Sequence, residues 1–242
     1  MYKKIKHRTA VKKGLPFFLL EGNSMVINKI GQQHIDYGIN CQDYGIETEK
    51  TKVVCDGCSE GKHSEVGAKT FCHLFSHDSR IANDCSAYTM AAAFGEMLGI
   101  FGQTSETIRD FLCFTILAVT EDRNNFYVTY CGDGFIVKEM PDGNIEFEEL
   151  SDGEYPMYFS YNFVNKESLK YYKDGVGFRT KTFPKTEYKN IGVASDGIRF
   201  AMENAGVLNE FKEVLQSGKE AKVKRFINRN QSVFQDDTTI VL

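Results

Sequence analysis

The sequence has no apolar stretch long enough to cross a bilayer as a helix. The longest strongly apolar run, Phe111 to Val119, falls well short of the ~20 residues that a membrane helix needs. The basic start of the chain is followed only by the apolar run Leu15 to Leu20 before Glu21, which is too short for the apolar core of a secretory leader. We therefore expect a cytoplasmic protein with no membrane partner.

The sequence also lacks an excess of positive charge. The 29 Lys and Arg residues are outnumbered by 33 Asp and Glu residues, and the net charge is -4. Because nucleic acids attract proteins mainly through basic surfaces, this balance gives no case for a nucleic-acid partner. The seven cysteines are odd in number and scattered, so a closed set of disulfides is not expected.

No internal repeat, low-complexity tract or linker divides the chain. Its length suits one large domain, and we expect a single, monomeric domain over residues 1–242 with a basic, frayed terminus over residues 1–14. Runs typical of strands lie at Pro16–Glu21, Ser24–Ile30, Tyr44–Thr48, Thr51–Cys55, Phe111–Thr120, Phe126–Cys131, Phe135–Met140, Ile145–Leu150, Asn190–Ser195 and Thr238–Leu242.

Helical patterns fall between the groups of strands. They run from Ser64 to Phe75, from Asp84 or Ser86 to Phe101, and over Val207–Leu215 and Ala221–Ile227. Gly31–Cys41 is polar and predicts a loop, and residues 151–188 are aromatic and irregular. This order predicts an α+β fold in which two stacked antiparallel sheets share one core and helices lie outside.

Three Asp-Gly pairs each follow an apolar run that we expect to be buried. They are Asp56-Gly57, Asp133-Gly134 and Asp196-Gly197, and an acidic pair, Asp236-Asp237, precedes the last strand. Asp-Gly is first of all a turn signal, and for any one pair alone a turn is the more probable interpretation. The pairs that lie in polar surroundings are interpreted as turns; these are Asp142-Gly143, Asp152-Gly153 and Asp174-Gly175.

Convergence of these carboxylates would change the interpretation. Carboxylates about 4 Å apart repel by roughly 4 kcal/mol per pair at an effective dielectric constant near 20, so such a cluster must be protonated, paired or bound to metal. Only Arg199 follows any of them closely in sequence. Hard divalent cations prefer oxygen ligands, and glycine lets a backbone carbonyl approach as a further ligand. If the carboxylates converge, the sequence predicts a divalent metal site.

The order of several short motifs carries a family resemblance. The motifs are Gln42-Asp43, Val54-Cys55-Asp56-Gly57, Ser64-Glu65-Val66-Gly67-Ala68, Gly132-Asp133-Gly134, Ala194-Ser195-Asp196-Gly197 and Asp236-Asp237. In this order the chain, from about Ile30 to Leu242, resembles the protein phosphatase 2C family, the metal-dependent PPM-type serine/threonine phosphatases. The stretch Gly31 to Asp43, with His34 and Cys41-Gln42-Asp43, resembles a bacterial branch of that family.

The resemblance implies two stacked antiparallel sheets flanked by pairs of helices, with the metals at one end. Asp56 would bridge two Mg²⁺ or Mn²⁺ ions, the Gly57 carbonyl would bind one ion, and Asp196 and Asp236 would complete the ligands of the other. Asp43 would support these ligands, and Asp133 would belong to a weaker third metal. Hydroxide held between the two ions would attack the phosphoester directly. Phosphorylated proteins are the implied substrates, with a cognate serine/threonine kinase as counterpart.

Three positions depart from the family pattern. Gly38 stands about where many members carry an arginine that grips the substrate phosphate, and Cys58 stands where a histidine is frequent. Phe200 replaces a second aspartate that usually follows the one matched by Asp196, which puts the third metal in question. The candidates to replace the missing phosphate ligand are His34, Lys62, His63 and Arg199.

Alternatives from other classes stay open at this stage. The departures motivate a catalytically silent binding module on the same fold. The pair Cys55 and Cys58, with His63, Cys72, His73 and His77 nearby in sequence, motivates a structural zinc site. The basic run Lys219, Lys222, Lys224 and Arg225 is interpreted as a solvated helix face, with docking to an acidic partner as the alternative.

Overall fold

The structure is a computed structural model that describes residues 25–78, 87–151, 157–164 and 175–242. Several sequence predictions lie outside these residues and are left as predictions. They are the basic terminus 1–14, the strand Pro16–Glu21, the helix starts Asp84 and Ser86, the turn Asp152-Gly153 and Asp174 of the turn Asp174-Gly175. None of the described helices is both long and apolar enough to cross a bilayer.

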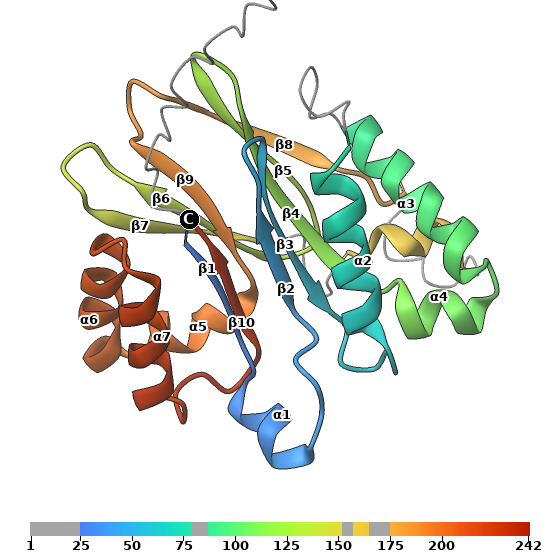
Figure 1. Cartoon of the computed structure of the whole chain (residues 1–242), viewed down its shortest axis with the longest axis horizontal. Coiled ribbons are helices and arrows are strands. Elements are labelled where there is room, and N and C mark those ends of the chain that lie inside the picture. Colours follow the sequence, from blue (N-terminus) through green and yellow to red (C-terminus); the bar gives the residue numbers. More distant parts are fainter. Residues whose placement is uncertain (1–24, 79–86, 152–156, 165–174) are drawn as a thin grey trace, which may run out of the picture.

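The strands of the described residues form two antiparallel five-stranded sheets, as predicted (Figure 1). The first sheet has the order β1 (Val26–Lys29), β10 (Thr238–Val241), β9 (Asn190–Ala194), β6 (Gly134–Glu139) and β7 (Ile145–Leu150). The second has the order β2 (Tyr44–Glu47), β3 (Thr51–Gly57), β4 (Phe114–Glu121), β5 (Asn125–Cys131) and β8 (Arg179–Pro184). Side chains such as Val54, Leu117, Ile136 and Val193 form a fully buried apolar layer between the sheets.

Helices cover the two outer faces, so the fold has four layers (Figure 1). The second sheet is covered by α2 (Ser64–Ser76), α3 (Ala87–Phe101) and α4 (Ser105–Phe111), which pack against it through an aromatic-rich core. The first sheet is covered by α5 (Arg199–Glu203), α6 (Ala205–Gln216) and α7 (Glu220–Arg229). The predicted α+β class with helices outside is confirmed, and the short helices α4 and α5 add to the expected pairs.

The prediction of a loop over Gly31–Cys41 is wrong, because α1 (Gln32–Tyr37) lies there. This short helix has a polar sequence, and it is held from outside. The amides of Gln32 and Gln33 donate to the carbonyl oxygens of Phe234 and Gln235 at 3.0 Å. Gly38 ends the helix with a φ of 67°, a left-handed conformation that favours glycine. Tertiary contacts, which have no local sequence signal, therefore form α1.

Two further predictions shift when the structure is known. The apolar run Phe111–Thr120 divides, with the end of α4 at Phe111 and the start of β4 at Phe114. The stretch 151–188, which was expected to be irregular, contains β8 and the short 3-10 helix η2 (Phe159–Asn162). The first departure occurs where one apolar run serves both a helix and a strand, so the two patterns overlap. The second occurs because β8 is an edge strand of mostly polar residues, which has little apolar alternation.

Two glycines in helices give opposite predictions for stability. A Cβ added at Gly67 would lie 1.6 Å from the carbonyl oxygen of Phe111, whereas one added at Gly95 would meet nothing within 4 Å. We expect Gly67→Ala to lower the free energy of unfolding by about 3 kcal/mol through overpacking. We expect Gly95→Ala to raise it by about 0.5–1 kcal/mol through helix propensity. Chemical unfolding of both variants tests this, and equal effects would contradict the close packing of α2 on α4.

Candidate metal centre

The predicted carboxylates lie where strands of both sheets begin or end. Asp43 precedes β2, Asp56 is the second-to-last residue of β3, and Asp196 lies two residues after the end of β9. Asp133 lies between β5 and β6, and Asp236 precedes β10. Pairing places these ends side by side, since β3 pairs with β2 and β4, and β9 pairs with β6 and β10. One end of the sandwich therefore receives carboxylates from five segments.

Interactions among the carboxyl groups show that they converge. The carboxyl group of Asp56 is adjacent to those of Asp43 and Asp196 and can share a hydrogen bond with either one when one group of the pair is protonated. The charge of Asp236 acts on Asp43, Asp56 and Asp196, and the charge of Asp133 acts on Asp196. The carboxylates therefore lie near enough at this end of the sandwich for their charges to act on one another.

This crowding opposes ionisation of the cluster. Burial raises the pKa of Asp56 well above its ordinary value, and the charges of Asp43 and Asp196 raise it further. Burial, followed by the charge of Asp237, likewise raises the pKa of Asp43. Burial and the charges of Asp133 and Asp236 raise the pKa of Asp196 to about 6, while Arg199 opposes that rise.

The donor set of the cluster fits a hard divalent cation. Among the described residues, no Lys or Arg forms an ion pair with Asp43, Asp56, Asp196 or Asp236. The Oδ2 atom of Asp43 is buried without a hydrogen-bond partner. Buried carboxylate oxygens that lack protons and cations are strongly unfavourable, and a divalent ion with oxygen ligands would satisfy them.

Glycine permits the close approach of the loops that carry these groups. A Cβ at Gly197 would lie 2.0 Å from the carbonyl oxygen of Asp237, and one at Gly57 would lie 2.7 Å from the carbonyl oxygen of Gln42. No other residue type leaves room for backbone at these distances. The glycines of the Asp-Gly pairs therefore position neighbouring loops of the site as well as freeing their own carbonyls.

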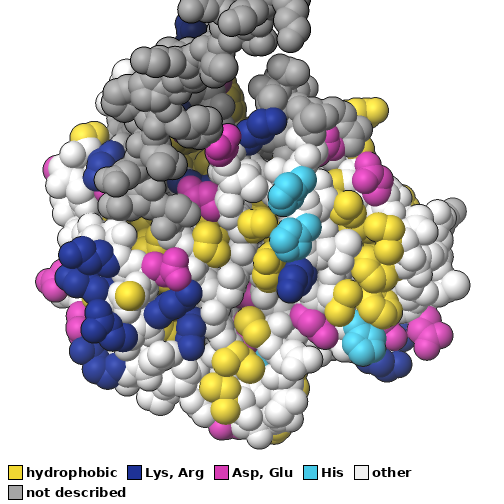
Figure 2. Space-filling view, viewed as in Figure 1, with side chains coloured by type: hydrophobic (Ala, Val, Ile, Leu, Met, Phe, Trp, Pro, Cys, Tyr) yellow, Lys and Arg dark blue, Asp and Glu magenta, His cyan; other side chains and the backbone are white. Residues whose placement is uncertain are grey.

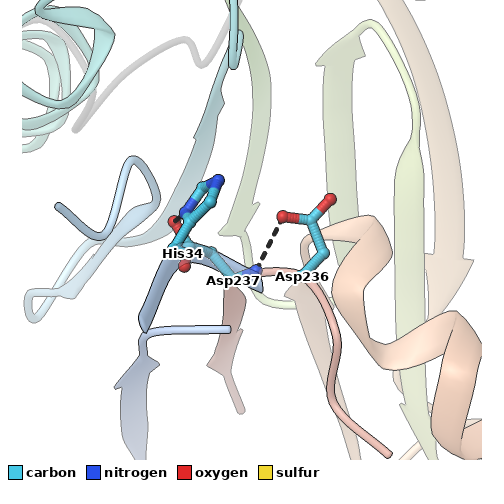
Figure 3. A group of neighbouring side chains, drawn as sticks. All are labelled: His34, Asp236 and Asp237. Carbon is cyan, nitrogen blue, oxygen red and sulfur yellow. Dashed lines mark hydrogen bonds and ion pairs between the residues drawn. The ribbon is translucent and has the colours of Figure 1, made fainter. Parts of the chain in front are cut away.

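A second group of candidate ligands consists of His34, Asp236 and Asp237, whose ligand atoms lie within 4.8 Å of one another (Figure 3). Asp237 is already satisfied by the protein. Its Oδ1 accepts from the Gly31 amide at 2.7 Å, and its Oδ2 accepts from the Gln42 amide at 2.5 Å and lies 2.9 Å from His34 Nδ1. Asp237 thus fastens the α1 segment to the start of β10, while one carboxyl oxygen of Asp236 faces the same group and accepts from the Asp237 amide at 2.8 Å (Figure 3).

Neighbouring aspartates should therefore respond differently to the same change. In metal-free protein, Asp237→Asn puts an amide donor against a backbone donor, and we expect a loss of about 2–3 kcal/mol in the free energy of unfolding. Asp236→Asn keeps the oxygen that accepts from the Asp237 amide at 2.8 Å and removes a repelling charge, so its stability should stay within about 1 kcal/mol of wild type. Urea unfolding in EDTA measures both, and the reverse order would contradict the assignment.

Three polar side chains that sequence reasoning did not place at the site hold its loops. The side-chain amide nitrogen (Nε2) of buried Gln42 donates to Cys58 O, Gly61 O and Ser64 Oγ at 2.9–3.3 Å. Ser195 Oγ accepts from the Thr239 amide at 2.9 Å, and Thr115 Oγ1 accepts from the Asp56 amide at 3.3 Å. Gln42 and Ser195 were already part of the motifs, but only their burial shows this supporting function.

The four candidates for binding phosphate lie in different surroundings. His34 is buried against Asp237, Lys62 forms an exposed ion pair with Asp110 at 3.4 Å, and His63 packs its ring on Phe111. Arg199 is the candidate whose charge acts on the cluster, through Asp196. Its Nη2 lies 3.2 Å from Glu149 Oε1, and its Nε is buried without a partner.

Cys58, which stands where a histidine is frequent, has an aromatic neighbour. Its side chain hydrogen-bonds to the hydroxyl of Tyr158, and burial is the main cause of the raised pKa of that phenol. Tyr158 is buried and feels the charge of Asp56, so its phenol stands close to the carboxylate cluster. The stretch around Tyr158 gave no interpretable pattern, and its proximity to the site comes only from the fold.

The zinc hypothesis for Cys55 and Cys58 finds no support. Cys55 is fully buried, and its side chain hydrogen-bonds to that of Cys72. Within the described ranges, the only trio of potential His, Cys, Asp or Glu ligands whose ligand atoms lie within 4.8 Å of one another is the one that contains His34, so neither these cysteines nor Asp43, Asp56 and Asp196 form so close a group. All six cysteines of these ranges are free, in agreement with the expectation of no disulfide set.

Comparisons with known proteins agree with this fold. The fold is similar to that of a serine/threonine phosphatase from Staphylococcus aureus, at 14% identity and a TM-score of 0.60, with 98% of each chain covered. It is also similar to the serine/threonine phosphatase PstP of Mycobacterium tuberculosis, at 14% identity and a TM-score of 0.57, with 90% of this chain and 96% of that one covered.

A structure of the PstP catalytic domain in complex with two manganese ions matches at 13% identity and a TM-score of 0.55, covering 90% of this chain and 95% of that one. At these identities the likeness establishes the fold alone. No curated protein matches the sequence significantly. The family model described as Protein phosphatase 2C matches residues 30–230, which is most of the chain. The chain therefore belongs to the protein phosphatase 2C family of protein phosphatases.

Proposed function

We propose that this chain hydrolyses phosphoserine and phosphothreonine in proteins with the help of two Mg²⁺ or Mn²⁺ ions. The observation that carries the proposal is the convergence of Asp43, Asp56, Asp196 and Asp236 without a neutralising ion pair, in a member of this family. Repulsion among such carboxylates lowers the stability of the fold, and bound cations would neutralise that repulsion.

The residues of the cluster take the following roles in the proposal. Asp56, the Gly57 carbonyl, Asp196 and Asp236 would hold the two ions. When bound, the ions supply a nucleophilic hydroxide at neutral pH and neutralise charge on the phosphoryl oxygens. Asp43, buried and adjacent to Asp56, orients the carboxyl group of Asp56.

A third ion is a weaker part of the proposal. Asp133 acts on Asp196 and so lies within reach of a further cation. Phe200, however, presents an exposed aromatic ring on α5 where the family pattern has a carboxylate. We therefore propose that any third ion is held by Asp133 with few protein ligands.

We propose Arg199 as the group that orients the substrate phosphate. Its positive charge lowers the pKa of Asp196. Its ion pair with Glu149 is partly exposed, so a substrate phosphate can compete with Glu149 for the guanidinium group. His34 is less suited because its Nδ1 is engaged with Asp237. Gly38, which stands where the arginine was expected, ends α1 and contributes no side chain.

The remaining expectations belong to the same proposal. The substrate is a phosphorylated protein, and the reaction reverses that of a cognate serine/threonine kinase. The chain acts as a single, monomeric domain in the cytoplasm, without nucleic acid or membrane as partner. The family match supports the class of substrate, and the balanced charge of the sequence supports the exclusion of nucleic acid.

Phosphate release is the experiment that tests the proposed function. p-Nitrophenyl phosphate and a phosphothreonine peptide are incubated with the protein in Mn²⁺, in Mg²⁺ and in EDTA. We expect turnover in at least one metal and none in EDTA. A folded protein without turnover in either metal would contradict the proposal and favour the silent binding module, for which Gly38, Cys58 and Phe200 are the motivating departures.

A further inference from the structure

The surface of α6 and α7 carries a concentration of cations. Between residues 219 and 229 the sequence has five Lys or Arg residues and one Glu, in a chain whose net charge is -4. Figure 2 shows Lys and Arg side chains gathered over these two helices, at the lower left. A groove of about 330 Å³ lies between the helices, and we call it the basic groove; it is lined by Glu210, Val214, Lys222, Arg225, Phe226 and Arg229.

Some cations of this surface have partners within the fold. Arg229 forms an ion pair with Glu210 across the groove, and Lys224 forms one with Glu220 along α7. Lys222 and Arg225 are both exposed, and neither has a carboxylate partner in the described part of the chain. Two uncompensated charges therefore face the same groove.

The fold gains nothing from these two charges. Lys222 lies in the first turn of α7, where a cation opposes the helix dipole. Lys222 and Arg225 are three residues apart on one helix, a spacing at which like charges destabilise by a few tenths of a kcal/mol. Their placement is unfavourable for the helix alone and becomes favourable when an anionic group binds.

The side chains at the floor and rim of the basic groove indicate which kind of anionic group would bind there. Phe226 is buried and Val214 half-buried, so the groove has an apolar floor below its charges. Glu210 on the rim is paired with Arg229, so Lys222 and Arg225 are the charges that an anionic group would meet in the groove. No large apolar side chain is exposed on the described α6 and α7, so membrane insertion has no anchor there.

We propose that the basic groove docks an acidic peptide segment of the phosphorylated protein substrate. Carboxylates of the segment would pair with Lys222 and Arg225, and its apolar atoms would cover Phe226. The proposal rests on the proposed function, because it assigns the segment to a phosphatase substrate. α7 leads directly into the loop that carries Asp236, so groove and cluster lie on one connected stretch of chain.

Peptide binding tests the docking without any catalysis. A fluorescein-labelled oligoglutamate peptide is titrated by anisotropy, at low salt and without metal, against wild type and two double variants. The groove variant, Lys222→Glu/Arg225→Glu, replaces two positive charges of the groove with negative charges. The control variant, Lys50→Glu/Arg123→Glu, makes the same charge change at exposed positions in strand-connecting turns. We expect about tenfold weaker binding for the groove variant and little change for the control. Equal effects in both variants would overturn the proposal.

Kinetics link the groove to the substrate and separate the two proposals. In kcat/KM, the groove variant should lose about tenfold for a phosphothreonine peptide with an acidic tail, and nothing for p-nitrophenyl phosphate. Unchanged discrimination between acidic and neutral tails in an active enzyme would refute docking alone. Absence of all turnover, with peptide binding still lost in the groove variant, would refute the proposed function alone.

Other anions and misfolding are controlled in the same series. If anionic vesicles or oligouridine bound through Lys222 and Arg225 while the glutamate peptide did not, the docking proposal would be wrong. Lys222→Gln/Arg225→Gln should give an intermediate loss of binding, and thermal unfolding should match wild type in all variants. A loss that appeared only in variants with lowered thermal stability would count against docking.

Discussion

Asp56→Ala is expected to lower Mn²⁺-dependent hydrolysis of p-nitrophenyl phosphate by about 10³-fold or more. The carboxyl group of Asp56 stands between those of Asp43 and Asp196, so its removal takes away a central ligand of the proposed ions. Steady-state rates at saturating Mn²⁺ measure the effect. Asp142→Ala is the matched control, because this aspartate sits in an exposed turn where it accepts from the Asn144 amide at 2.9 Å.

The same substitution should not weaken the metal-free fold. Burial and neighbouring charges raise the pKa of Asp56, so the group is unfavourable there when ionised, and alanine relieves the repulsion. We expect metal-free Asp56→Ala to unfold at a temperature equal to or above that of wild type. Activity retained in both Asp56→Ala and Asp196→Ala would contradict the assignment of the cluster, and a large loss of stability in EDTA would contradict its electrostatic basis.

The second large effect is the dependence of stability on pH and metal. The pKa of Asp196 is raised from 3.8 to about 6, and those of Asp43 and Asp56 are also raised. At pH values between the ordinary pKa of these groups and their raised pKa in the folded protein, the folded state holds protons that the unfolded chain has released. The free energy of unfolding therefore falls as pH rises. We expect the melting temperature of metal-free protein to fall by about 5 °C or more between pH 5 and pH 8.

Divalent metal should reverse that trend. Cations compete with protons for the carboxylates, so Mn²⁺ should bind more tightly at pH 8 than at pH 5 and raise the melting temperature more there, by about 5 °C. Thermal unfolding with Mn²⁺ and with EDTA at both pH values measures this. Asp196→Asn should flatten both dependences. A metal-free protein that is more stable at pH 8 than at pH 5 would show that the cluster is neutralised in some other way.

Much of the fold could be predicted because its strands are bounded by strong local signals. Asp56 and Asp196 each end an apolar run with Gly, and Asp142-Gly143 has the expected turn, with Gly143 at a φ of 88°. Asp56, Asp133 and Asp196 could be named because a charged residue at the end of a buried run is unusual. Asp236 was visible only as part of an acidic pair, and Asp43 only through the family resemblance. The sequence could not show that these carboxylates come together, because strand pairing is set by contacts far apart in sequence. The metal site was therefore predicted only on the condition that they do.

The rest of the site depends on such distant contacts. Asp237 was identified only as part of an acidic pair, and nothing local shows that it accepts from the amides of Gly31 and Gln42. α1 is fastened by the same segment, which explains why its polar sequence predicted a loop. Tyr158 reaches Cys58 from a stretch that has no periodic pattern. These features depend on which strand ends and loops lie together in the fold, and local patterns in a single sequence do not reveal those contacts.

Calorimetric titration of Mn²⁺ into the EDTA-stripped protein tests the central claim most directly. The account predicts binding of two ions by wild type at neutral pH, and loss of this binding in Asp56→Ala while Asp142→Ala behaves as wild type. It also predicts that ion binding and phosphate release are lost together. Wild-type protein that is folded but binds no Mn²⁺ at millimolar concentration, or Asp56→Ala that binds two ions as tightly as wild type, would contradict the assignment of this cluster as the metal centre.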